Sequence, residues 1–149
     1  MLQRFELFTS GISSVYRDVQ KIERDEMEKQ GLRGSFAQYL LAISRYPEGV
    51  TAAVLCDVCD KDKAAVSRVV AEMEAKGLVE RETGNQYRAK LRLTPAGEEA
   101  AAFVRKRASA AVELAGKALS EEDRKAFYGA LAVISNTLQQ ISSTGLPEE

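Results

Sequence analysis

The chain has 149 residues and a mass of 16.3 kDa, the size of one ordinary domain. Hydrophobic residues make up 45% of it and charged residues 29%, which excludes collagen-like, low-complexity and wholly disordered classes. Histidine is absent, so the commonest general base and metal ligand are missing and His-dependent hydrolases, histidine kinases and most zinc enzymes are excluded. We therefore expect a binding protein without a cofactor rather than an enzyme.

The net charge is -1, from 21 basic and 22 acidic residues, so bulk electrostatics neither favours nor excludes a polyanionic partner. The first residues alternate apolar and charged side chains and contain no apolar run of signal-peptide length. Residues 126–147 carry no charge, but polar side chains interrupt them, so no membrane span is expected. These patterns predict a soluble, cytoplasmic protein.

Both ends of the chain carry apolar side chains in a heptad rhythm, in predicted helices near residues 2–29, ending at Gly31, and 120–142. The two stripes consist of Phe5, Phe8, Ile12, Val15, Val19 and Ile22, and of Phe127, Leu131, Ile134, Leu138 and Ile141. A stripe this narrow is typical of helices that pair with another helix. We expect residues 1–30 and 120–142 to form a homodimer. The alternative is that the two helices pack on each other within one chain.

Capping residues mark two short helices after the first long one. Ser35 and Gln38 have the spacing of a capping box, and the helix that they open is expected to stop at residues 47–49, Pro-Glu-Gly. Thr51 is expected to cap the next helix, which ends near Cys59. Its predicted inward-facing residues are Val54, Leu55 and Val58.

A third short helix is predicted from Asp62, as its cap, to Lys76, with Gly77 as the left-handed residue that ends it. Its apolar face has helical spacing and consists of Val66, Val69, Val70 and Met73. The opposite face carries small and polar side chains.

After Gly77 the apolar period changes from 3.6 to 2, which predicts strands at 78–82 and 87–94 joined by a turn at 83–86. The returning strand places Tyr87, Ala89, Leu91 and Leu93 on one face and Arg88, Lys90, Arg92 and Thr94 on the other. From residue 81 to 94, four basic residues stand against one acid, a local charge of +3. The hairpin therefore has a basic side.

A connecting helix is predicted over 95–119, with Pro95 at its first position, where the missing N–H costs nothing. Ser120 and the three acids after it then begin the last helix. The whole chain is interpreted as a single domain, mainly α with a small β-hairpin wing. It combines a winged helix-turn-helix lobe over residues 35–94 with terminal dimerisation helices.

In a winged helix-turn-helix the second helix enters the major groove, so its outward side chains must be small or able to touch bases and phosphates. The residues predicted for this role are Lys63, Ala64, Ser67 and Arg68. The wing residues predicted to contact DNA are Arg88, Lys90 and Arg92. The alternative for the helix is an ordinary solvated charged face.

Four segments resemble the MarR-type winged-helix transcriptional regulators. They are LCDVC at 55–59, DKAAVSRVV at 62–70, MEAKGLVER at 73–81 and LTPAG at 93–97. The resemblance spans nearly the whole chain. It implies a dimer whose terminal helices pair, whose winged lobes bind a palindromic operator, and whose affinity often falls when a small molecule binds. A ligand-responsive repressor is the function that this resemblance implies.

Cys56 and Cys59 form a C-x-x-C pair that has no second pair and no histidine to complete a zinc site. They are interpreted as small core residues, with redox sensing as the alternative. A candidate effector pocket for a phenolic acid or aromatic carboxylate combines aromatic and cationic side chains. Its residues are Tyr16, Arg17, Tyr39, Arg45 and Tyr46, for which ordinary interface packing is the alternative.

The sequence thus predicts a homodimeric, sequence-specific regulator that binds double-stranded DNA. The leading alternative is a winged-helix module whose basic hairpin binds an acidic protein. A thiol oxidoreductase is disfavoured, because the cysteine pair lies in a helix-turn-helix rather than after a strand of a βαβ unit.

Overall fold

The structure is a computed structural model that describes residues 1–83 and 88–147. The predicted turn at 83–86 and the first strand residue, Tyr87, therefore fall largely outside the described residues. The chain divides into two compact units, Met1–Ala110 and Ala111–Glu149. The fold is mainly α with one two-stranded antiparallel hairpin, which confirms the predicted fold class.

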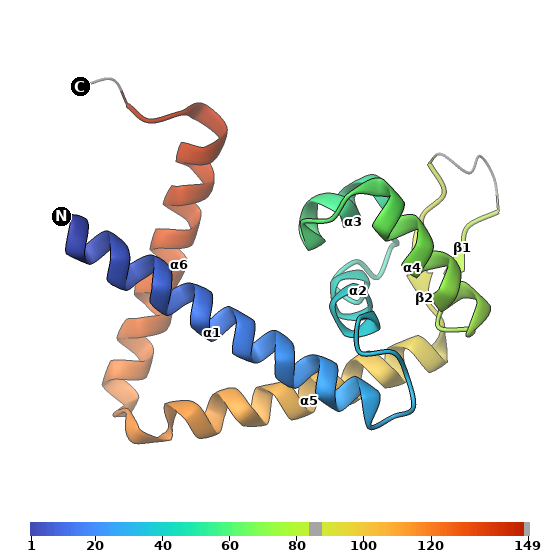
Figure 1. The fold of residues 1–149 in the computed structure, drawn as a ribbon, viewed down its shortest axis with the longest axis horizontal. Helices are drawn as coiled ribbons and strands as arrows, with labels where there is room; N and C mark the ends of the chain where they lie inside the picture. The colour runs from blue at the N-terminus through green and yellow to red at the C-terminus, as the bar shows by residue number, and fades with distance from the viewer. Residues whose placement is uncertain (84–87, 148–149) are drawn as a thin grey trace. The chain divides into compact units, whose positions relative to one another are not determined.

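The first unit contains four helices and the hairpin, followed by the start of a fifth helix (Figure 1). The helices are α1 (Leu2–Glu28), α2 (Phe36–Ile43), α3 (Ala52–Cys59), α4 (Lys63–Ala75) and α5 (Pro95–Ala115). The strands are β1 (Val79–Arg81) and β2 (Leu91–Leu93). The central helix α2 contacts α1, α3 and β2, and α4 contacts α3 and β1.

One apolar core joins these elements. Its largest fully buried side chains are Phe36, Met27, Leu40, Ile43, Leu55, Met73, Leu91, Val66, Val70 and Val104. They come from α1 through α5 and from β2, so the helix-turn-helix and the hairpin are held by the same packing that holds the end of α1 and the beginning of α5. The position of α4 is therefore fixed by its buried face.

The predicted caps of three helices are confirmed. Thr51 Oγ1 accepts from the Val54 N–H at 3.3 Å, Asp62 Oδ1 accepts from the Ala65 N–H at 2.7 Å, and Ser120 Oγ accepts from the Asp123 N–H at 3.0 Å. Gly77 has a φ of 71°, the left-handed conformation predicted for it at the end of α4.

The capping box predicted at Ser35 and Gln38 is wrong. Ser35 has helical dihedral angles and makes no side-chain cap bond, and the Gln38 amide instead donates to the Cys59 carbonyl at 2.9 Å. The bond ties α2 to the end of α3, so a long-range contact replaces the local one. The prediction that Val54 and Val58 face inward is also wrong, since they are 39% and 40% exposed while Leu55 and Cys59 are buried.

The strands are shorter than predicted, and the connecting helix ends early. β1 and β2 pair with Val79 opposite Leu93 and Arg81 opposite Leu91. A further antiparallel bridge joins Val50, before α3, to Leu91. α5 ends at Ala115, and a 3₁₀ turn at Gly116–Ala118 precedes α6.

The second unit consists of the end of α5, the 3₁₀ turn and α6 (Glu121–Thr144). Arg124 holds the turn together: its guanidinium donates to the Gly116 carbonyl at 2.9 Å and pairs with the Glu113 carboxylate at 2.9 Å. α6 itself has no buried residue. Within the described residues, no helix is long and apolar enough to cross a membrane.

Candidate nucleic-acid interface

The exposed side of α4 is the centre of the candidate interface. Its opposite side buries Val66, Val70 and Met73, while Val69 is half-buried. The four residues predicted to meet DNA, Lys63, Ala64, Ser67 and Arg68, are all exposed. The side of α4 predicted to face DNA is thus exposed to solvent. Its side chains are small near the middle and cationic at the beginning and at Arg68.

The acids of α4 have cationic partners. Glu72 pairs with Arg33 from the segment between α1 and α2, and the Arg81 Nε donates to Glu74 at 2.9 Å. Within the described residues, Arg68 has no hydrogen bond or ion pair of its own. The guanidinium of Arg68 therefore remains available for a phosphate or a base edge, while the negative charge of the same helix is balanced elsewhere.

A tight turn sets α4 relative to α3. Asp60 has a φ of 51°, a left-handed conformation that aspartate tolerates better than most residues, and the Lys61 N–H donates to the Cys56 carbonyl at 3.0 Å. The Asp62 cap follows directly. These local bonds and the buried faces of the two helices form the helix-turn-helix.

The wing carries three predicted cations in two different settings. Arg88 and Lys90 are exposed, whereas Arg92 is half-buried and its guanidinium donates to Glu82 and to the Glu48 carbonyl, both at 3.1 Å. Ala89 and Leu91, between the cations, are buried, as the period of two predicted. The hairpin therefore has the predicted basic side, but the positive charge of Arg92 is paired with Glu82 within the chain.

The cysteines lie in α3, beside this interface. Cys59 is buried and Cys56 is half-buried, and both thiols are free. Burial raises the pKa of the Cys59 thiol, which decreases the thiolate fraction that oxidation requires. The packing role is therefore favoured over redox sensing. In the parts of the chain that the structure describes, no three His, Cys, Asp or Glu side chains come together as metal ligands.

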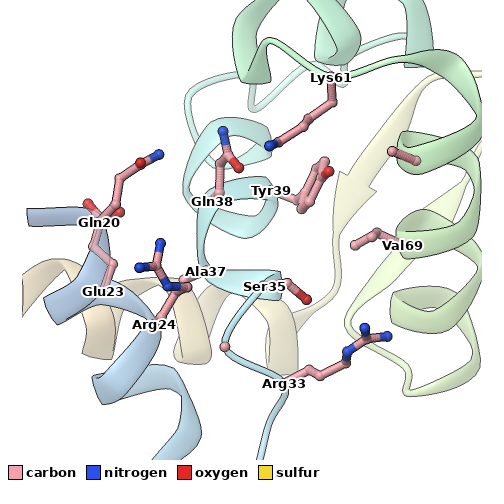
Figure 2. A pocket seen from close by; sticks show the side chains of 12 residues that line it. Gln20, Glu23, Arg24, Arg33, Ser35, Ala37, Gln38, Tyr39, Lys61 and Val69 are labelled. Atoms are coloured by element: carbon pink, nitrogen blue, oxygen red, sulfur yellow. The ribbon is translucent and has the colours of Figure 1, made fainter. Parts of the chain in front are cut away.

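A cavity of about 340 Å³ lies between α1, α2 and α4 (Figure 2). Gln20, Glu23 and Arg24 line it from α1, Gln38 and Tyr39 from α2, and Lys61, Ala65 and Val69 from the turn and α4. Burial raises the pKa of Glu23, and this rise is opposed by the positive charges of Arg45 and Arg24. The Ser35 hydroxyl, also in the lining, is buried without a hydrogen-bond partner in the described structure.

The predicted effector residues are distributed differently from the expectation. Tyr39 lines the cavity just described, and Tyr46 lines a second cavity of about 380 Å³ between the end of α2, β2 and α5. Tyr16, Arg17 and Arg45 line neither of these two cavities. The lining residues Arg24, Gln38 and Lys61 were missed, because a spacing pattern does not show which faces of α1 and α2 meet.

The apolar stripes of the end helices are open to solvent in the single chain. In α1, Phe5 and Val15 are 62% and 63% exposed, and in α6, Phe127 and Leu138 are 51% and 49% exposed. Val19, Ile22, Leu131 and Ile141 are half-buried. Aromatic and aliphatic side chains repeated along a helix at this exposure form an apolar surface of the kind that marks an interaction site.

The arrangement of two helices, a tight turn and a basic hairpin defines a winged helix-turn-helix protein. Residues 26–88 match the model of a family described as the MarR family. No curated protein matches the chain.

Solved structures share the fold over nearly the whole chain. A MarR regulator from Methanosarcina mazei Go1 has a TM-score of 0.79 and 21% identity, over 91% of this chain and 99% of that one. One from Silicibacter pomeroyi has a TM-score of 0.70 and 21% identity, over 93% and 90%. A putative MarR regulator from Listeria monocytogenes, in complex with a 26-mer DNA, has a TM-score of 0.73 and 19% identity, over 95% and 97%. The resemblance of this chain to MarR-type winged-helix regulators is therefore confirmed.

Proposed function

We propose that this protein is a transcriptional regulator that binds double-stranded DNA in a sequence-specific manner as a homodimer. α4 enters the major groove of each half-site of a palindromic operator, and the wings contact the flanking backbone. The observation that carries the proposal is the exposed face of α4, where Ser67 and Arg68 are open to solvent. The acids of the same helix, Glu72 and Glu74, are neutralised in ion pairs. The matched family model over 26–88 and the DNA complex of the Listeria relative support the same reading.

Each exposed residue has a role in this proposal. Arg68 makes a bidentate contact with guanine or holds a phosphate, Ser67 bonds to either, and Lys63 near the start of α4 lies beside the backbone. Ala64 allows close approach to the groove. Arg88 and Lys90 reach the backbone or the adjacent minor groove from the wing.

The dimer is proposed from the end helices. α6 spans Glu121–Thr144 and buries none of its residues, and the stripe of α1 is open along its first half. A helix gains little stability in water without a packed face, so α6 and the first half of α1 are expected to pack against a partner. Sedimentation equilibrium is expected to give twice the chain mass of 16.3 kDa. A monomer at micromolar concentration would contradict the dimer.

Ligand response is proposed for the cavity beside α4 rather than for the five residues expected from the sequence. Its volume of about 340 Å³ suits a small molecule, and Arg24, Lys61 and the ring of Tyr39 suit an aromatic carboxylate. An occupant touching Ala65 and Val69 lies against the buried side of α4, so binding there shifts the helix and lowers operator affinity. Such a protein acts as a repressor that the ligand releases. Titration of benzoate derivatives into the protein–DNA complex, followed by fluorescence anisotropy, tests this release.

DNA binding is tested with fragments from the region upstream of the protein's own reading frame, against random DNA of the same length. The proposal predicts preferential binding, half-sites about 10 bp apart or a multiple of that spacing, and a steep loss of affinity with salt. Equal affinity for both DNAs at moderate salt would refute sequence-specific binding. Retention of an acidic protein partner without any DNA preference would favour the winged-helix interaction module instead.

A further inference from the structure

The base of the wing is a small three-segment sheet. β2 pairs with β1 on one side and with Val50 on the other, where the Val50 N–H donates to the Leu91 carbonyl at 3.0 Å and the Leu91 N–H donates to the Val50 carbonyl at 2.8 Å. Each strand of the hairpin is only three residues long. So short a two-stranded ribbon is marginal in water by itself, and contacts at its base decide where the wing points.

Arg92 joins all three segments of this base. It lies in β2, and its terminal guanidinium nitrogen donates to the carboxylate of Glu82, just after β1, and to the backbone carbonyl of Glu48, just before the bridged segment. Both distances are 3.1 Å. The Arg92 and Glu82 side chains are 42% and 46% exposed, so the pair is partly shielded from water.

Gly49 makes the contact with Glu48 geometrically feasible. It has a φ of 96°, and a Cβ at this position would lie 2.7 Å from the Cβ of Lys90. Only a residue without a side chain lets the backbone pass this close to Lys90, the residue before β2, and this passage places the Glu48 carbonyl next to the guanidinium. Arg92 is therefore held by a backbone carbonyl, which Gly49 brings close to it, and by an ion pair with Glu82.

The other two wing cations differ. Arg88 and Lys90 are exposed, and neither has a hydrogen bond or ion pair within the described residues. Their charges are available for phosphates, whereas the charge of Arg92 is balanced by Glu82. Arg88, Lys90 and Arg92 are all predicted to contact DNA, and the contacts of Arg92 favour a different role for it.

We propose that Arg92 is a positioning residue: with Glu82 and the Glu48 carbonyl, it fixes the direction of the wing so that Arg88 and Lys90 reach the DNA backbone. This inference rests on the proposed function. A direct phosphate contact by Arg92 is the competing role, and the two roles differ in the effect expected from removing the acid.

The decisive variant is Glu82→Gln. If Arg92 contacts phosphate, removing its carboxylate partner frees the guanidinium and tightens DNA binding. If Arg92 positions the wing, the same change weakens binding by roughly threefold, and Arg92→Gln weakens it by roughly fivefold, the range expected for losing a partly shielded ion pair with a charged hydrogen bond. Tighter binding by Glu82→Gln would overturn the proposal.

Coupling between residues gives a second readout. The effect of Arg88→Ala on operator affinity is expected to be several-fold smaller in the Arg92→Gln background than in the wild type, since the wing is already misdirected there. Two independent phosphate contacts would give additive effects and would also overturn the proposal. The double variant Arg92→Glu with Glu82→Arg is expected to recover part of the operator affinity that Arg92→Gln loses. Lys90→Gln is the control for a direct phosphate contact: it is expected to reduce the slope of log affinity against log salt concentration by about 0.9.

Hydrogen exchange separates this proposal from the proposed function. In the absence of DNA, Arg92→Gln is expected to accelerate exchange of the Leu91 and Val50 amides by about tenfold, while amides in the core of α2 remain unchanged. Unchanged exchange at Leu91 and Val50 would contradict the positioning role even if DNA binding fell. Faster exchange in a protein with no operator preference would refute DNA binding and leave the role of Arg92 in the wing standing. If Arg92→Gln does not fold, the exchange rates of the Leu91 and Val50 amides are compared between Glu82→Gln and the wild type.

Discussion

Gly97, in the first turn of α5, is the position where one added methyl group has the clearest consequence. A Cβ there would lie 2.0 Å from the Leu78 carbonyl oxygen and 3.0 Å from its carbonyl carbon. The obstructing atoms are backbone, so no side chain can rotate away. Gly97→Ala therefore requires the beginning of α5 to separate from the segment that leads into β1.

The size of the effect follows from two opposing contributions. Overpacking against a fixed neighbour destabilises by about 3 kcal/mol, whereas alanine gains about 1 kcal/mol over glycine in helix propensity. The net loss is about 2 kcal/mol, or roughly 6–8 °C in Tm for a chain of this length. Thermal unfolding by far-UV circular dichroism at one fixed protein concentration measures this shift, because the Tm of a dimer depends on concentration.

Gly129→Ala is the matched control. Gly129 lies within α6, and nothing stands within 4 Å of a Cβ built there, so the same substitution receives only the gain in propensity. Its Tm is expected to rise by about 3–4 °C. A Gly97→Ala protein as stable as the wild type would refute the close packing of α5 on the segment before β1.

Four further predictions concern one helix cap, two carboxylates and the corner before α6. Asp62→Ala removes the α4 cap and is expected to lower the free energy of unfolding by about 1 kcal/mol in urea titration; no change would show that the cap bond contributes nothing. Burial raises the pKa of Glu23 above its ordinary value of 4.5, so its ionised form destabilises the fold; Glu23→Gln is expected to raise the Tm at neutral pH, with the gain vanishing below pH 4.5. Glu26 has the opposite sign: hydrogen bonds led by that from Lys29 lower its pKa, so Glu26→Gln is expected to lower the Tm at neutral pH, and a loss that persists unchanged in acid would contradict this account. Arg124→Ala removes the bonds that hold the end of α5 to α6 and is expected to weaken the dimer several-fold in sedimentation equilibrium; an unchanged dimer would show that the corner does not orient α6.

The local signals of the sequence proved reliable where the structure uses local bonds. The caps at Thr51, Asp62 and Ser120 depend on atoms three residues apart, so their sequence pattern is enough to predict them. The apolar spacing of α4 likewise identified its exposed side, because a buried stripe determines what lies opposite. Fold class and the location of the candidate interface follow from these features.

Contacts between distant segments could not be predicted in this way. Gln38 is bonded to the Cys59 carbonyl, 21 residues away, and this contact makes the capping box at Ser35 wrong. In α3 the helical period was right, but the buried side is that of Leu55 and Cys59, since packing on α2 decides which face turns inward. A count of charged residues in the sequence likewise does not show which cations form ion pairs in the folded chain.

The wing illustrates the same limit. A count over residues 81–94 gives four basic side chains against one acid, yet Arg81 is paired with Glu74 and Arg92 with Glu82. The first of these partners lies in α4, outside the segment counted. The charge available to a polyanion at the wing is therefore smaller than the sequence indicates, and it is concentrated at Arg88 and Lys90.

The central claim is that the exposed side of α4 reads DNA, and the affinity of Arg68→Ala for an operator fragment tests it most directly. Lys106→Ala, which removes one positive charge from an exposed position of α5, is the control. Arg68→Ala is expected to weaken binding by about 1–3 kcal/mol and to reduce the preference for the operator over random DNA, while Lys106→Ala binds as the wild type does. Equal affinities for Arg68→Ala, Lys106→Ala and the wild type, with each protein dimeric and folded, would contradict the account.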